Sequence, residues 1–132
     1  MSIGSWIKPV LIAALAGATF SSQAVVIGNT QGSADFPQGA VSFADAVVTY
    51  AVGPGGVSVP HQGAINAIGV PNYAGVNSCA SQASCTFVSL GDGGALTVRF
   101  IDNLLTGSGN ASADLWIFEV GPDIEDTFVE IS

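Results

Sequence analysis

Cys79 and Cys85 are the only cysteines in the chain, and a short loop rich in serine and alanine separates them. In an exported protein, two cysteines this close together form a disulfide that pins the loop between them. Metal binding is the alternative chemistry, but zinc wants four ligands and the only histidine, His61, lies far away in the sequence. A catalytic redox pair would have the spacing C-x-x-C, which is not present. The sequence therefore predicts a structural disulfide between Cys79 and Cys85.

Carboxylates and amides gather in the last third of the chain and would suit a hard cation. Calcium takes about six to eight oxygen ligands from such groups. Loops at one end of a β-sandwich would bring four of these residues together: Asp102, Asn103, Asp123 and Asp126. Neither an EF-hand nor an Asp/Gly nonapeptide spacing is present. We favour the simpler interpretation that these acids cap turns and solvate strand edges, and calcium is kept as a cofactor hypothesis.

Glu119 is the most unusual acid, because it lies within the apolar run LWIFEV at 115–120. A carboxylate buried in a core needs a partner, and Arg99 is the only basic residue beyond the N-terminal segment. We therefore predict a structural ion pair between Glu119 and Arg99 across neighbouring strands. The alternative is that Glu119 is a catalytic carboxylate. Glycosidases use two such acids, however, and nothing in the sequence indicates which residue would be the second.

Other catalytic motifs are missing from the sequence. His61 has no partner that would complete a triad, and no G-x-S-x-G nucleophile elbow is present. Tyr73 and Trp116 are side chains that would stack on a sugar ring, although Trp116 suits a protein core better. The sequence thus favours a protein that is not an enzyme.

The N-terminus has the three parts of a secretory signal peptide. The only lysine, Lys8, precedes a short apolar run at 10–18, and small residues then lead to a cut after Ala24. A bilayer-spanning helix needs about 20 apolar residues, more than this run supplies. We therefore expect residues 1–24 to be removed and residues 25–132 to be exported to the periplasm, the cell surface or the medium, without membrane insertion.

The mature segment is strongly acidic. Its ten acidic residues face one arginine, a formal charge of about −9. Nucleic acids and anionic lipid headgroups require a basic face, so neither is expected as a partner. The composition remains too apolar for intrinsic disorder.

Alternating apolar residues and glycine-rich turns predict an all-β fold. Strands are expected near 25–28, within 41–52, at 86–90, 95–101, 114–120 and 127–132. The Asp92-Gly93 turn predicts a hairpin between 86–90 and 95–101. Residues 57–84 lack periodicity and are expected to be irregular, with one short strand or helical turn around 64–68. The expected architecture is an antiparallel β-sandwich. We expect it to be incomplete, because the sequence stops within what looks like a strand and a sandwich of immunoglobulin size needs about seven strands. The alternative is that residues 127–132 form a terminal strand in their own right.

Residues 87–132 resemble a module of bacterial exported proteins. The shared pattern comprises an SLG-x-GG turn, an apolar strand, a Gly/Ser loop, DLWIFE-x-G and E-x-TFVEIS, and the upstream segments 43–50 and 67–73 are also similar. Many proteins with this module belong to the PEP-CTERM class of sorted exoproteins. The resemblance implies a galactose-binding-like or jelly-roll sandwich, truncated here at its C-terminal end, and it carries over no catalytic residues.

Together these features favour an exported, non-catalytic module that binds a glycan or a surface or matrix protein, with calcium bracing its loops. The alternatives are a secreted hydrolase, or a fragment of one, that uses the acidic residues, and a purely structural exoprotein.

Overall fold

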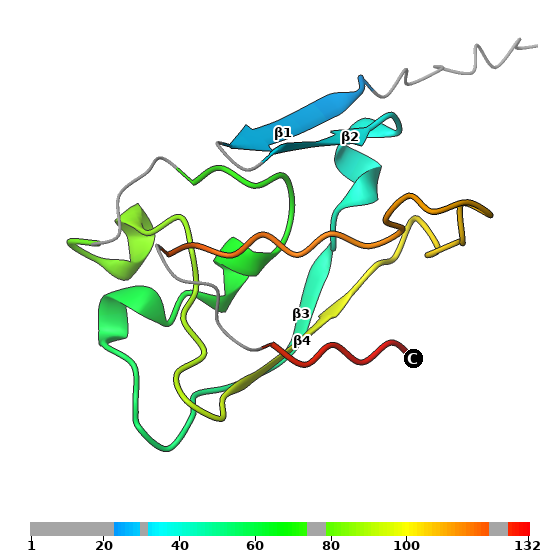
Figure 1. The fold of residues 1–132 in the computed structure, drawn as a ribbon. Helices are drawn as coiled ribbons and strands as arrows, with labels where there is room; N and C mark the ends of the chain where they lie inside the picture. The colour runs from blue at the N-terminus through cyan, green and yellow to red at the C-terminus, as the bar shows by residue number, and fades with distance from the viewer. Residues whose placement is uncertain (1–22, 30–31, 74–78, 122–126) are drawn as a thin grey trace, which may run out of the picture.

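The computed structural model describes residues 23–29, 32–73, 79–121 and 127–132 (Figure 1). Nearly all of the predicted signal peptide lies outside these residues. Within the described parts, the chain forms two small two-stranded antiparallel sheets joined by long irregular segments. The prediction of a β-rich protein is therefore confirmed at this coarse level.

The first sheet pairs β1 (Val25–Asn29) with β2 (Gly32–Phe36), and it confirms the predicted strand at the start of the mature segment. The β-branched residues of β1 favour an extended backbone. Its register places Ile27 opposite Ala34, which is buried. At the end of β2, the ring of Phe36 packs 4.8 Å from that of Phe43, one of the few large buried side chains. The hairpin is thereby anchored to the segment that leads into the second sheet.

The second sheet pairs β3 (Ala46–Ala51) with β4 (Ala95–Arg99). A bulge near Val48 shifts the register between its neighbours, and beyond it Tyr50 faces Leu96. In β4, Leu96 and Val98 are half-buried while Thr97 and Arg99 are exposed, as the alternation predicts. Both predicted strands are therefore present, although each is shorter than expected.

The predicted hairpin between 86–90 and 95–101 is wrong. The turn forms, since the Gly94 N–H donates to the Gly91 carbonyl at 3.0 Å, but residues 86–90 are not a strand. Their backbone groups bond elsewhere: the Ser89 N–H donates to the His61 carbonyl, and the Leu90 carbonyl accepts from the Gly53 N–H, both at 2.9 Å. The partner of β4 is therefore β3, from much earlier in the chain.

The described residues between the strands contain only short 3-10 turns. They are η1 (Gly39–Ser42), η2 (Val59–His61), η3 (Ala64–Ala67) and η4 (Gln82–Ser84). The η3 turn confirms the helical turn expected around residues 64–68. No helix in the described parts of the chain is long and apolar enough to span a bilayer.

The C-terminal third differs most from expectation. Residues 115–120 and 127–132 run extended without belonging to a strand, and Figure 1 draws both as plain coil. The predictions of strands at 114–120 and 127–132 are therefore wrong. Trp116 is 46% exposed and Phe128 is 97% exposed, because the described residues place no neighbouring strand against them. Among the described residues, the buried apolar side chains are few: Ala34, Phe43, Ala44 and Cys85.

Candidate functional site

A pocket of about 310 Å³ lies between β1 and the extended segment 115–120. One wall is β1, at residues 26–28, and the opposite wall is residues 118–120. Pro71 and Tyr73, from the irregular region, complete the lining. Three parts of the chain that are distant in sequence therefore build this pocket.

Phe118 fixes the extended segment to the first sheet. Its ring centroid lies 6.0 Å from that of Phe36, which in turn packs against Phe43. Aromatic pairs at such separations prefer the tilted geometry observed here. The next residue, Glu119, is thereby held at the pocket. It is exposed there, whereas the sequence predicted that it would be buried.

Tyr73 gives the pocket an aromatic side chain with a polar end. Its ring meets that of Phe87 edge to face, with 6.3 Å between centroids, and the residue is 40% exposed. The pocket thus combines apolar walls, a phenol and a carboxylate. Such a combination, mostly apolar with a few polar groups, is typical of sites that bind small ligands.

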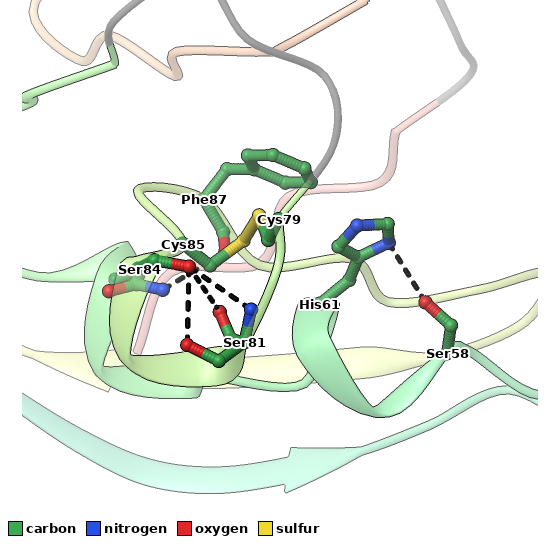
Figure 2. The surroundings of a disulfide bond; sticks show 8 residues. Ser58, His61, Cys79, Ser81, Ser84, Cys85 and Phe87 are labelled. Atoms are coloured by element: carbon green, nitrogen blue, oxygen red, sulfur yellow. Dashed lines mark hydrogen bonds between the residues drawn. A yellow bond between two sulfur atoms is a disulfide. The ribbon is translucent and has the colours of Figure 1, made fainter.

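A second cluster surrounds the disulfide (Figure 2). Cys79 and Cys85 form the predicted disulfide, with their Cα atoms 5.0 Å apart. His61 is distant in sequence but lies beside this disulfide, because a ring nitrogen of His61 and the two sulfur atoms lie within 4.8 Å of one another. Cys85 is buried, whereas His61 and Cys79 are half-buried.

Several contacts hold His61 in this place. Its ring lies 5.1 Å from that of Phe87, and its Nδ1 is 3.2 Å from the hydroxyl of Ser58. Its carbonyl accepts the hydrogen bond from Ser89. Nearby, the side chain of Asn66 donates to the Phe87 carbonyl at 3.1 Å. The two turns η2 and η3 are thereby fastened to the segment that follows Cys85.

Serines order the loop between the two cysteines. The Ser81 N–H donates to the Ser84 hydroxyl at 3.1 Å, and that hydroxyl donates to the Ser81 carbonyl at 3.0 Å (Figure 2). The first of these bonds, together with the bond from the Ser84 N–H to the Ser81 hydroxyl, forms a capping box around η4. The loop therefore has local order in addition to the covalent link.

The four predicted calcium ligands are only partly described. Asp102 is exposed and Asn103 is half-buried, whereas Asp123 and Asp126 lie outside the described residues. The Oδ1 atom of Asn103 is buried and has no hydrogen-bond partner. The calcium hypothesis stays a prediction.

The predicted ion pair also stays a prediction. Arg99 is exposed at the end of β4, where its sheet partner is Ala46 of β3. Glu119 lies in the extended segment at the pocket, so the two residues are not on neighbouring strands of the described sheets. The structural reason given for the pair, burial of Glu119 in a core strand, does not hold.

A comparison of the chain with protein-family models, with curated proteins and with solved structures finds no match. The residues that line the pocket are therefore the basis for the proposed function.

Proposed function

We propose that this chain is an exported, non-catalytic module that binds a glycan in the pocket between β1 and residues 118–120. The observation that carries the proposal is the position of Tyr73 and Glu119 in the lining of the same pocket. The C–H face of a sugar ring packs well on an aromatic ring, and its hydroxyls donate to a carboxylate. The one arginine of the mature segment suits an uncharged ligand better than an anion.

The signal peptide, the disulfide and the resemblance to PEP-CTERM-type exoproteins support export to the cell surface or its surroundings. In the same proposal, the fold is a β-sandwich of the galactose-binding-like or jelly-roll kind. In this proposal, segments 115–120 and 127–132, which are not strands in the structure, cover its sheets. Their exposed large side chains, Trp116, Phe118 and Phe128 among them, support this part of the proposal, because a soluble protein rarely leaves so many uncovered.

A glycan array on the purified protein tests the binding function, with calcium in one arm and EDTA in the other. We expect at least one neutral glycan to bind, and we expect Tyr73→Ala and Glu119→Gln to weaken that binding by about tenfold or more, equivalent to about 1.4 kcal/mol each. The matched controls are Phe128→Ala and Asp92→Asn, which remove an exposed ring and an exposed carboxylate away from the pocket.

Absence of binding in both arms would count against a glycan ligand and would favour a protein partner or a structural role. Equal weakening by the control variants would show that the pocket is not the binding site. Loss of binding and a lower melting temperature in EDTA alone would support the calcium hypothesis. Release of reducing sugar from a bound glycan, abolished by Glu119→Gln, would replace the binding function by the hydrolase alternative.

A further inference from the structure

The cluster of His61 with the two cysteines offers chemistry that the disulfide alone does not use. One imidazole nitrogen and two sulfur atoms converge within 4.8 Å. Imidazole and thiolate are the ligands that zinc takes in proteins. This cluster is separate from the pocket with Tyr73 and Glu119, because the two share no lining residue.

We propose that reduction of the Cys79–Cys85 disulfide converts this cluster into a zinc site, with His61, Cys79 and Cys85 as its three protein ligands and a water molecule as the fourth. The same three residues therefore have two states. The oxidised state holds a disulfide, and the reduced state binds a metal ion.

The geometry favours this assignment. In a tetrahedral zinc centre with bonds of about 2.0–2.3 Å, the ligand atoms lie roughly 3.3–3.8 Å from one another. The nitrogen lies within 4.8 Å of both sulfurs, so it needs to approach them by about 1 Å at most, and the two sulfurs separate once their bond is broken. Cys79 and Cys85 are separated by six positions, with Cα atoms 5.0 Å apart, so the second thiolate binds as part of the same chelate.

The surroundings of His61 also suit a histidine that binds zinc. A histidine that binds a metal usually donates its other ring N–H to a nearby acceptor, which fixes the ring. The hydroxyl of Ser58, 3.2 Å from Nδ1, is such an acceptor, and Nε2 then carries the lone pair. Phe87 packs on the ring and Cys85 is buried, so the site is partly shielded from water.

The redox step is balanced by a thiol reductant. Two thiols give two electrons and two hydrogens to the Cys79–Cys85 bond and become a disulfide themselves, which leaves two cysteine thiols. Zinc then displaces both thiol protons into solvent, so that two thiolates and a neutral imidazole surround the ion. A reducing compartment favours the metal-bound state and an oxidising one favours the disulfide.

Zinc titration of the full chain, monitored by competition with a chromophoric chelator, tests the proposal. The chain is first reduced with a phosphine, which takes an oxygen atom from water, becomes the phosphine oxide and leaves two thiols. We expect one zinc ion per reduced chain, and no binding of comparable affinity by the oxidised chain. His61→Ala is expected to lower the affinity by about tenfold or more, and Cys79→Ser/Cys85→Ser is expected to abolish binding.

X-ray absorption on the zinc-loaded, reduced wild-type chain keeps the test independent of any variant that fails to fold. Two sulfur ligands and one imidazole would support the site. Coordination without imidazole, or equal affinity in the His61→Ala variant, would overturn it. Binding of zinc with the same affinity by the oxidised chain would also overturn it, because the sulfurs of a disulfide are not thiolate ligands.

Discussion

At the scale of single residues, the fold changes the ionisation of Tyr50. Its hydroxyl donates to the Ser89 carbonyl at 2.6 Å, which ties β3 to the segment before the Gly91 turn. Desolvation by burial raises the pKa of Tyr50 above its ordinary value. The neutral phenol is therefore the form that the folded state favours.

This shift predicts a loss of stability at high pH. The pKa of Tyr50 is higher in the folded state than in the unfolded state. The stability that the neutral phenol contributes is therefore fully present below about pH 10, and it is lost as the pH rises through the pKa of the folded state. Tyr50→Phe should remove this part of the pH dependence. At pH 7 it should also cost about 0.5–1.5 kcal/mol through the lost hydrogen bond.

Denaturant unfolding of both proteins at pH 7 and above pH 10 measures the two effects. Tyr73→Phe is the matched control, since Tyr73 lies in the pocket lining and is 40% exposed. An identical alkaline loss in wild type and Tyr50→Phe would contradict the prediction.

At the scale of elements, a close backbone contact joins the ends of β3 and β4. A Cβ atom on Gly53 would lie 1.9 Å from the Asp92 carbonyl oxygen, and one on Gly94 would lie 2.0 Å from that of Leu90. Glycine at both positions therefore lets the turn at 91–94 pack against the chain that leaves β3. This contact positions residues 86–90, and through the Ser89–His61 hydrogen bond it also supports the cluster at the disulfide.

Gly53→Ala should destabilise the protein by about 1–3 kcal/mol, the usual cost of forcing an extra methyl group into a packed site. Gly55→Ala is the matched control in the same loop, because a Cβ atom there meets nothing within 4 Å and no positive φ is required. Thermal unfolding of both variants gives the comparison. Equal melting temperatures for Gly53→Ala and Gly55→Ala would show that the contact is not needed.

At the scale of the whole molecule, signal-peptide cleavage and the disulfide each change the mass of the intact chain. If the predicted signal peptide is cleaved after Ala24, the mature chain begins at Val25, and the Cys79–Cys85 bond makes that chain about two daltons lighter than its dithiol form. Intact-mass measurement of the protein recovered from outside the cytoplasm checks both features at once. A mass that still includes residues 1–24 would contradict cleavage, and a gain of about two daltons only after reduction would support the disulfide.

The sequence by itself determined the features that depend on local patterns. The β-branched residues before Gly28, the alternation around Val98 and the turn after Asp92 each act over a few residues, so their strands and turn could be predicted. The close cysteine pair was predictable for the same reason, since a short loop brings its two ends together.

Only the tertiary structure decided which distant segments meet. β4 pairs with β3 rather than with its neighbour in sequence, and residues 86–90 bond instead to Gly53 and His61. His61 reaches the disulfide, and Tyr73 reaches the pocket of Glu119, through these non-local contacts. Their free energy comes from backbone hydrogen bonds and ring packing between parts of the chain that no local pattern relates. The chemistry of single residues was therefore visible in the sequence, but their grouping into a pocket and a redox-sensitive cluster required the fold.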